Sequence, residues 1–299
     1  MYKMSHSNKH VTQKTALSGW VNGLVGVIIF SGSLPATKLA VKELNPFFLT
    51  FSRASIAGLL GLFILLIFRE KIPQKRQLLS LIIVAIGVVI GFTLLTALAL
   101  QYVSSSHSIV FLGLLPLVTA IFAVLRGGEY PKPVFWLFSI IGSSLVAGYA
   151  LSKGTATASI GDLLMVLAVI LCGMGYAEGA KLTKSLGGWQ VICWSLVISL
   201  PLMLCATYLT KPITLSEIHS ISWLSLGYVS IFSMLVGFIF WYTGLAQGGT
   251  AVVGQLQLLQ PFFGLALSAF LLDEKIDPAI IMVTGLVILC VYGSNRFSK

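Results

Sequence analysis

The chain has 299 residues, of which 57% are hydrophobic and only 9% are charged, and its mean hydropathy is +0.97. Soluble proteins carry about 25% charged residues, so this composition excludes a soluble globular fold and places the chain in a lipid bilayer. The formal net charge of +10 comes from short basic clusters between apolar runs, a pattern that is typical of membrane loops and does not indicate a nucleic-acid partner.

Ten apolar stretches, each close to the length of a membrane-spanning helix, follow a polar N-terminal tail of residues 1–18. A helix needs about 20 apolar residues to cross a bilayer. Turn-forming residues such as Asn45-Pro46 and Gly127-Gly128 mark the breaks. The sequence therefore predicts an all-α integral membrane protein with ten transmembrane helices. We expect these helices at 19–40, 46–68, 78–101, 104–126, 133–151, 160–183, 189–210, 221–246, 249–272 and 278–295.

Basic residues fall mainly on one of the two sides that ten helices define. The N-terminal tail, residues 69–76, 126–132 and 181–184, and the C-terminus contribute to that side. The other side has only Lys42, Lys153, Lys211 and Lys275. By the positive-inside rule, we expect both termini in the cytoplasm and the protein in a cell membrane, either inner or plasma membrane.

The two halves of the chain repeat one motif. Pro116 is followed by Glu129, and Pro261 is followed at the same spacing by Glu274, so the motif recurs after 145 residues (116 to 261 and 129 to 274). Because each half holds five helices, an odd number, the copies must enter the membrane in opposite senses. Inverted repeats of this kind are typical of secondary transporters and enclose a central cavity. The predicted repeats are 19–153 and 154–299.

The stretch from Ala97 to Glu129 (ALALQYVSSSHSIVFLGLLPLVTAIFAVLRGGE) and its echo from Leu245 to Glu274 resemble the ten-helix EamA family of the drug/metabolite transporter superfamily. Arg53, which follows Asn45-Pro46, also matches the family's pattern. The resemblance implies two five-helix bundles around a pseudo-twofold axis in the membrane plane. It also implies that helices one, three, four, six, eight and nine surround the cavity. Helices five and ten would be peripheral, so we expect a monomer or a homodimer formed through them.

Two cations lie inside predicted helices. Arg53 is about seven residues into its helix, where an unpaired cation costs roughly 2.5 to 3.5 kcal/mol on insertion scales. It therefore needs an anion, carbonyl groups or water. One interpretation is that Arg53 attracts a carboxylate of the substrate, and the other is a structural tether to loop carbonyls or to Glu43. Lys38 is either a second site residue or a side chain that reaches the membrane surface.

Glu178 is the one carboxylate clearly inside a predicted helix. Low dielectric favours the neutral form of a carboxyl group, so Glu178 is a candidate for loading and releasing a proton during transport. The alternative is a structural ion pair with Lys181, which is three residues further along the helix. His107, at the start of the fourth helix, is a second candidate for proton coupling.

Polar and aromatic residues inside the helices are the remaining candidates for a substrate site. Gln257 and Gln260 share one helical face, and amides can hydrogen-bond both a carboxylate and an ammonium group. Trp241 shares a face with Ser233 and Gly237, which favours an inward position. Helix packing and lipid contact are the alternative explanations for such residues. The full set is Ser33, Thr37, Thr93, Thr96, Phe111, Tyr176, Trp241, Gln257 and Gln260.

Pro116 and Pro261 lie at matching positions in the middle of the fourth and ninth helices. A proline inside a helix removes a backbone hydrogen bond and crowds the preceding turn. Paired interruptions in the two halves of a transporter indicate the transport site, so we expect the prolines to be hinges. The alternative is a kink that only shapes helix packing.

The sequence lacks G-x-S-x-G, HExxH and Walker A motifs, and its four cysteines lie in apolar stretches without metal-ligand spacing. We therefore expect no enzyme activity, no cofactor and no bound metal. The expected partners are a small-molecule substrate and membrane lipids. The resulting prediction is a secondary-active exporter of amino acids or related amphiphilic compounds that works by alternating access. The alternative is a multispanning scaffold or enzyme subunit that transports nothing.

Overall fold

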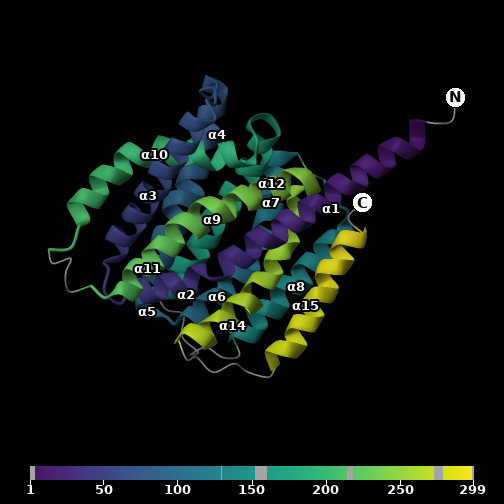
Figure 1. Cartoon of the computed structure of the whole chain (residues 1–299). Helices are drawn as coiled ribbons and strands as arrows, with labels where there is room; N and C mark the ends of the chain where they lie inside the picture. The colour runs from purple at the N-terminus through teal and green to yellow at the C-terminus, as the bar shows by residue number, and fades with distance from the viewer. Residues whose placement is uncertain (1–3, 129, 152–159, 214–217, 273–278, 298–299) are drawn as a thin grey trace.

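The computed structural model describes residues 4–128, 130–151, 160–213, 218–272 and 279–297, and over these ranges the regular structure is entirely helical (Figure 1). In the first half the helices are α1 (Met4–Ser31), α2 (Ser33–Ala40), α3 (Pro46–Ile67), α4 (Lys75–Val84), η1 (Ala85–Gly91), α5 (Phe92–Tyr102), α6 (Ser105–Phe111), η2 (Leu112–Leu114), α7 (Leu115–Gly127) and α8 (Pro133–Leu151). In the second half they are α9 (Ile160–Leu186), α10 (Gly188–Thr210), α11 (Ser220–Tyr228), η3 (Val229–Val236), α12 (Gly237–Gly248), α13 (Thr250–Gly254), η4 (Gln255–Leu259), α14 (Gln260–Leu272) and α15 (Ala279–Phe297).

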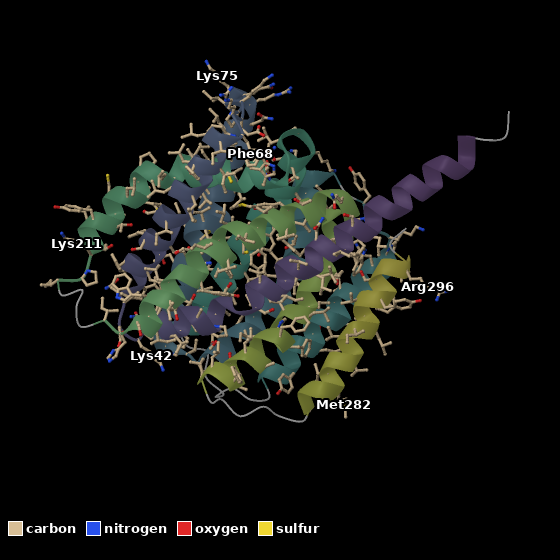
Figure 2. All side chains as sticks on the ribbon, viewed as in Figure 1. Lys42, Phe68, Lys75, Lys211, Met282 and Arg296 are labelled. Atoms are coloured by element: carbon tan, nitrogen blue, oxygen red, sulfur yellow. The ribbon has the colours of Figure 1, made fainter. Side chains whose placement is uncertain are left out.

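These helices join end to end into ten spans, as the sequence predicts. Eight are long and apolar enough to cross a membrane: Leu17–Ala40, Pro46–Ile67, Lys75–Tyr102, Ser105–Arg126, Ile160–Leu186, Gly188–Thr210, Ser220–Gly248 and Thr250–Leu272. The fifth and tenth spans contain the shorter apolar segments Pro133–Tyr149 and Gly285–Ser294. Large apolar side chains such as Leu59, Phe63 and Leu66 are exposed, which suits a surface that faces lipid. Charged side chains such as Lys42, Lys75, Lys211 and Arg296 lie near helix ends (Figure 2).

The backbone irregularities repeat between the two halves. A π-helical segment interrupts the third span at η1 and the eighth at η3, 144 to 145 residues apart (85 to 229 and 91 to 236). A 3₁₀ segment interrupts the fourth span at η2 and the ninth at η4. Short π-helical segments are rare and are concentrated at functional sites. The repeated interruptions extend the predicted internal symmetry from sequence to backbone geometry.

The packing of the spans follows the same symmetry. The first span packs on the eighth through α1 and α12, and the third packs on the sixth through α5 and α9. The second span packs on the seventh (α3 on α10), and the fifth on the tenth (α8 on α15), side by side in Figure 1. Exchanging the two halves leaves this set of pairs unchanged. The fold is therefore two inverted five-helix repeats around a common centre.

The two hinge candidates lie where a 3₁₀ segment passes into a new α-helix. Pro116 is in the first turn of α7, and Pro261 is in the first turn of α14. A proline is tolerated in the first turn because the amide hydrogen that it lacks has no helical acceptor there. The fourth and ninth spans therefore change winding at matching depths.

The first span breaks at Gly32, and the break is specific to the first half. Pro35 cannot donate to the carbonyl of Ser31, and the Tyr228 hydroxyl donates to the carbonyl of Ile29 at 2.6 Å. A Cβ atom at Gly32 would collide with that hydroxyl. The matching sixth span, α9, is continuous. α1 also begins at Met4, so the helix includes most of the segment expected to be a polar tail.

Four residues considered above lie outside the described ranges, namely Glu129, Lys153, Glu274 and Lys275.

Candidate functional site

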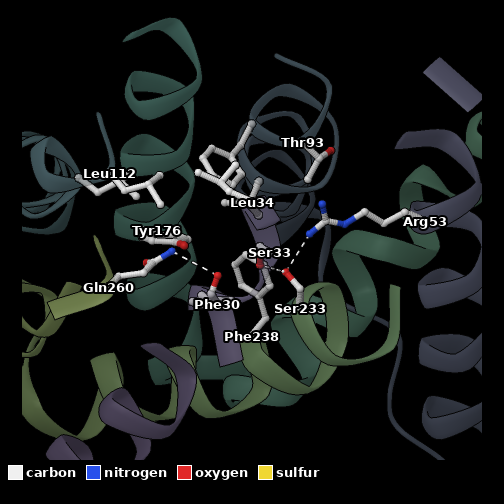
Figure 3. Close-up of a pocket in the computed structure, with 13 residues that line it drawn as sticks. Phe30, Ser33, Leu34, Arg53, Thr93, Leu112, Tyr176, Ser233, Phe238 and Gln260 are labelled. Atoms are coloured by element: carbon white, nitrogen blue, oxygen red, sulfur yellow. Dashed lines mark hydrogen bonds between the residues drawn. The ribbon is translucent and has the colours of Figure 1, made fainter. Parts of the chain in front are cut away.

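A small cavity lies at the centre of the bundle (Figure 3). Its volume is about 20 Å³, which is room for about one water molecule, so a substrate requires the spans to separate. Seven of the ten spans contribute side chains. The lining residues are Phe30, Ser33, Leu34, Arg53, Val88, Phe92, Thr93, Leu112, Leu115, Tyr176, Ser233, Phe238 and Gln260.

Arg53 is the charged residue of this lining, and only 4% of its surface is exposed. Its Nη2 donates to the Ser233 hydroxyl at 2.9 Å, and that hydroxyl lies 2.5 Å from the hydroxyl of Ser33 (Figure 3). Among the described residues, Arg53 Nε has no hydrogen-bond partner, and no carboxylate lies within 4.0 Å of the guanidinium group. The first, second and eighth spans therefore present a buried cation without a counter-charge to the cavity.

Glu43 is not the tether of Arg53 that one interpretation of the sequence suggested. Its carboxylate accepts from the Ser222 hydroxyl at 2.7 Å and from the backbone N–H of His219 at 3.0 Å, and it pairs with His219 Nδ1. The serine hydroxyl and the histidine together hold the pKa of Glu43 below its usual value. The Glu43 carboxylate therefore binds residues at the start of the eighth span and does not bind Arg53.

Four aromatic rings form a cluster beside the arginine. The ring centroids of Phe30 and Phe238 are 4.9 Å apart, and those of Tyr176 and Trp241 are 5.5 Å apart. Phe30 also lies 6.2 Å from Trp241, and Tyr176 lies 5.9 Å from Phe238. Trp241 is fully buried, which agrees with the inward position expected from its small neighbours. The cluster offers apolar surface together with ring faces that attract cations.

Two of the three glutamines of the ninth span, Gln257 and Gln260, are buried beside these rings. Gln260 Nε2 lies 3.5 Å from the carbonyl oxygen of Phe30 (Figure 3). Within the described ranges, Gln260 Oε1, both polar atoms of Gln257 and Trp241 Nε1 have no hydrogen-bond partner. Each unsatisfied buried polar group costs about 1–3 kcal/mol. A polar ligand that entered here would find donors and acceptors already free of protein partners.

Two of the predicted threonines are buried beside the site with their hydroxyl groups already bonded. Thr93 lines the cavity and donates to the Val89 carbonyl at 2.6 Å, and Thr96 donates to the Phe92 carbonyl at 2.8 Å. Thr37 is buried one turn beyond Ser33. These residues shape the site, and Ser33 is the predicted hydroxyl that joins the Arg53 network.

Lys38 and Phe111 lie outside the lining of the central cavity. Lys38 Nζ donates to the carbonyls of Leu100 at 2.6 Å and Val103 at 3.1 Å, where it caps the end of α5. A cation is favourable at the C-terminus of a helix. The ring of Phe111 lies 5.7 Å from that of His107.

Glu178 has a different ion-pair partner from the one expected. Its carboxylate accepts from Arg126 Nε at 2.6 Å and from the Ser80 hydroxyl at 2.6 Å, so Arg126 replaces Lys181 as the partner. α7 packs on α9 and brings the arginine to a carboxylate that is 1% exposed. The contact connects spans of the two halves beside the central cavity.

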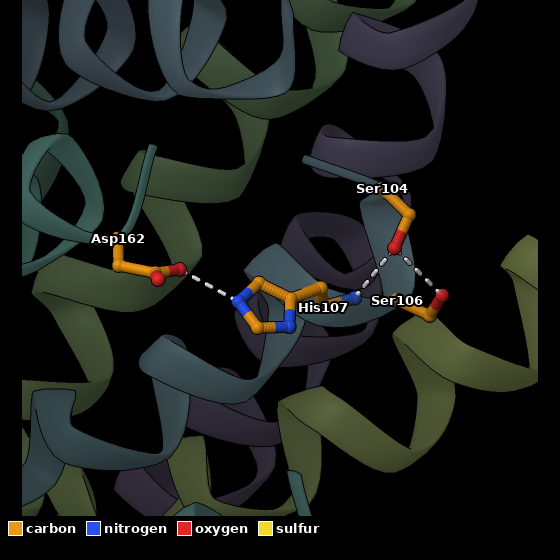
Figure 4. A network of polar contacts seen from close by, with 4 residues as sticks. All are labelled: Ser104, Ser106, His107 and Asp162. Atoms are coloured by element: carbon orange, nitrogen blue, oxygen red, sulfur yellow. Dashed lines mark hydrogen bonds and ion pairs between the residues drawn. The ribbon is translucent and has the colours of Figure 1, made fainter. Parts of the chain in front are cut away.

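His107, the other candidate for proton coupling, lies on the opposite side of the cavity. His107 Nε2 is 2.6 Å from Asp162 Oδ1, and the backbone N–H of His107 donates to the Ser104 hydroxyl (Figure 4). This pair joins the starts of α6 and α9. The two candidates therefore hold the halves together at opposite ends of the bundle.

The sequence did not indicate Ser233, Arg126 or Asp162 as functional partners. Ser233 shares a face with Trp241, which is a signal that could have placed it inward. The charge pattern groups Arg126 with a loop cluster that sets orientation, and nothing local in the sequence shows that it reaches Glu178. Phe30 and Phe238 are ordinary apolar residues in the sequence, and only the packing of the first and eighth spans brings them together.

The inverted repeats, the apolar spans and a buried polar centre are the features of a membrane transporter. The chain belongs to the EamA-like transporter family, whose model matches residues 17–150 and 159–296. The two matches correspond to the two repeats. Family membership excludes the alternative of a non-transporting scaffold or enzyme subunit.

Known proteins resemble the chain over nearly its whole length. It is 60% identical to the Bacillus subtilis (strain 168) "Uncharacterized transporter YdeK" over 282 residues, which is 94% of this chain and 98% of that protein. It is 26% identical to the "S-adenosylmethionine/S-adenosylhomocysteine transporter" of Chlamydia muridarum (strain MoPn / Nigg), over 89% of this chain and 87% of that protein. A solved structure described as "Crystal structure of protein" superposes with a TM-score of 0.75 at 17% identity, covering 94% of this chain and 97% of that one, and it supports the fold.

Proposed function

We propose that the protein is a secondary-active transporter that exports amino acids or related amphiphilic metabolites carrying a carboxylate. The observation that carries this proposal is Arg53, a buried guanidinium group on the central cavity without a carboxylate partner among the described residues. A buried charge without a counter-ion is unfavourable, and charged residues inside membrane spans mark substrate pathways. A substrate carboxylate supplies the missing charge and accepts from guanidinium donors in a bidentate manner.

The rest of the site suits the other parts of such a molecule. Phe30 and Phe238 provide surface for an apolar side chain. The amides of Gln257 and Gln260 and the ring faces of Tyr176 and Trp241 suit an ammonium or another cationic group. The substrate named for the chlamydial relative is itself an amino-acid derivative, which supports this class and fixes no particular member of it.

Transport proceeds by alternating access in this proposal. The small cavity is a closed state, and the halves separate first at one end and then at the other. The changes of winding at Pro116 and Pro261 are the hinges. Glu178 or His107 couples the cycle to protons, and exchange or the substrate gradient is the alternative source of energy. Both termini are cytoplasmic, and the protein is a monomer or a homodimer through α8 and α15.

The test is counterflow in proteoliposomes of the purified protein, with a panel of radiolabelled amino acids and their carboxamides. At least one amino acid should exchange, its carboxamide should not, and Arg53→Gln should lower the exchange rate by about 10- to 100-fold. Lys211→Gln is the matched control because it removes one exposed cation at the end of α10. Equal exchange of an amino acid and its carboxamide would remove the basis of the proposal.

A further inference from the structure

A second hollow opens at the end of the bundle where α4 begins and α9 ends. Its volume is about 240 Å³, far larger than that of the central cavity. It is lined by Arg76, Gln77, Ser80, Lys181, Leu182 and Ser185. We call this hollow the vestibule. One wall comes from the first repeat and the other from the second, so the vestibule lies on the seam that must open in alternating access.

The vestibule carries two cations and no matching carboxylate in its lining. Arg76 and Lys181 are both exposed, and in the described part of the chain neither has a carboxylate within 4.0 Å. Gln77 holds the walls in place, because its Oε1 accepts from the backbone N–H of Gln74 at 2.8 Å and its Nε2 donates to Ser185 at 3.2 Å. The result is a shaped hollow with an excess of positive charge.

The vestibule and the central cavity lie along the same two helical spans. Ser80 is in the vestibule wall and also donates to Glu178. Two turns further along the third span, Val88 lines the central cavity, and on α9 the cavity residue Tyr176 is two positions from Glu178. The Glu178 layer, with Arg126 as its cation, therefore separates the vestibule from the central cavity.

We infer that the vestibule is a peripheral binding site for the carboxylate of the transported molecule, occupied before the molecule reaches Arg53. This inference rests on the proposed function, since it extends the same substrate class to a second site. A carboxylate between Arg76 and Lys181 lies beside the Ser80 hydroxyl and competes with Glu178 for it. Binding at the vestibule thereby weakens one of the two bonds that hold the Glu178 layer closed.

Cations also line a hollow at the opposite end of the bundle. That hollow has a volume of about 220 Å³ and is lined by Lys38, Val41, Lys42, Leu100 and Gln101. An anionic group thus meets paired cations at both ends and Arg53 between them. The vestibule is the better site, because Lys38 already donates to two backbone carbonyls.

Cysteine labelling tests the vestibule without relying on transport. Ser185→Cys places a thiol in its exposed wall, and Cys205→Ser removes the cysteine that is exposed, since Cys172, Cys193 and Cys290 are buried. The probes are an anionic (sulfonatoethyl) and a cationic (trimethylammonioethyl) methanethiosulfonate, applied in phosphatidylcholine nanodiscs. The double variant Arg76→Gln/Lys181→Gln should lower the anionic-to-cationic rate ratio about tenfold, because two nearby charges are lost.

The matched control is Lys75→Gln/Lys184→Gln, which removes two exposed cations from the same two helices outside the lining. It should leave the ratio within about twofold of the parent value, since its charges lie farther from the thiol. Millimolar L-methionine should protect the thiol introduced by Ser185→Cys from labelling, whereas L-methioninamide, which lacks the carboxylate, should not. Equal ratios in the two double variants, or equal protection by the two ligands, would overturn the inference.

A lipid phosphate is the competing occupant, and the same assay separates it. If phosphatidylglycerol in the nanodisc slows labelling and methionine does not protect, the vestibule binds lipid and the inference is wrong. For transport, Arg76→Gln/Lys181→Gln should raise the KM several-fold for substrate added on the vestibule side alone. Arg53→Gln, by contrast, should lower transport of substrate added on either side. The transport assay therefore distinguishes an error in the vestibule inference from an error in the proposed central site.

Discussion

Two buried charges of this protein are held in opposite ways. Glu178 is 1% exposed and is bonded to the cation Arg126 and to Ser80, whereas Arg53 is 4% exposed and is bonded to one neutral serine. A charge that is neutralised inside the protein holds elements together, and one that is not neutralised attracts a partner from outside. The Glu178–Arg126 pair is therefore interpreted as a contact that holds the two halves together, and Arg53 as a site that binds the substrate.

The internal symmetry makes this difference sharper. The second span begins at Pro46 and the matching seventh span at Gly188, so the position that matches Arg53 is at about Leu196. Among the described residues, the buried cation therefore occurs in the first half alone. The π and 3₁₀ segments of the backbone are repeated, and the buried cation Arg53 is not. Because the two halves share one backbone arrangement, the bundle can open at either end in a similar way. The buried charges that are not repeated make the two ends of the bundle chemically different.

The largest expected effect is the loss of transport in Arg53→Gln. Hydrogen bonds to charged groups contribute about 1.5–3 kcal/mol. Losing the guanidinium group should therefore lower the initial rate of transport at a fixed, low substrate concentration by about 10- to 100-fold. Arg53→Lys should retain part of the activity, because it keeps the charge and loses the bidentate geometry. The measurement is the initial rate of counterflow. Wild-type rates in Arg53→Gln would contradict the assignment of the site.

Stability should respond in the opposite sense at the two charges. Arg126→Met leaves the buried Glu178 carboxylate without its cation and should destabilise the fold by about 1–3 kcal/mol, allowing for the partial exposure of Arg126. Arg53→Met removes a buried charge that has no counter-ion among the described residues, and it should be neutral or stabilising. Thermal unfolding in detergent checks both. The double variant Arg126→Met/Glu178→Gln should recover part of the loss, and equal destabilisation by both arginine variants would abolish the contrast.

Proton coupling gives a third comparison, between Glu178 and His107. If Glu178 carries the coupling proton, Glu178→Gln should lose the several-fold stimulation by a pH gradient and retain exchange without a gradient. His107→Gln is the matched control at the other end of the bundle, and it should keep the stimulation. The measurement is uptake with and without an imposed pH gradient. Stimulation that persists in Glu178→Gln and disappears in His107→Gln would move the coupling to the His107–Asp162 pair.

A smaller effect is expected from the glutamines beside the aromatic rings. One hydrogen bond contributes about 0.5–1.5 kcal/mol, so Gln257→Leu should raise the apparent KM about three- to tenfold with little change in the maximal rate. Gln255→Leu is the control, since its Nε2 already donates to Ser139 at 3.2 Å. An unchanged KM in both Gln257→Leu and Gln260→Leu would remove the glutamine face from the site.

The ten spans and the repeat could be predicted because both depend on patterns within the chain. Apolar length gives the spans, as for α3 and α10, whose bounds fall within one residue of those expected. Pro116 and Pro261 mark matching depths by themselves. The π-helical segments could not be foreseen, because η1 and η3 are ordinary apolar sequence and their winding depends on the spans packed against them.

The partners of the buried charges could not be predicted for the same reason. Sequence spacing gives the depth of Glu178 and its neighbour Lys181, and it gives no information on the rotation of α7, which brings Arg126 from 52 positions away. Arg53 meets Ser233 across 180 positions. The sequence therefore identifies Glu178 and Arg53 as charged residues inside spans, and their partners are known only once the tertiary packing is known.

The smallest effect concerns Glu43, the exposed counterpart of the two buried charges. Its pKa is lowered first by the Ser222 hydroxyl and then by His219, so its ionised form is favoured in the folded protein. Its contribution to stability is present above the ordinary pKa of about 4.5 and is lost as the pH falls through the lower value of the folded state. The melting temperature of Glu43→Gln should therefore be slightly below that of the wild type at pH 7, and the gap should close near pH 3. Ser222→Ala should remove part of the gap at pH 7, because it deletes the largest cause of the shift. If the difference in melting temperature between the wild type and Glu43→Gln instead widened as the pH falls, the ionised Glu43 carboxylate would destabilise the folded protein, and the contacts with Ser222 and His219 would not stabilise this exposed charge.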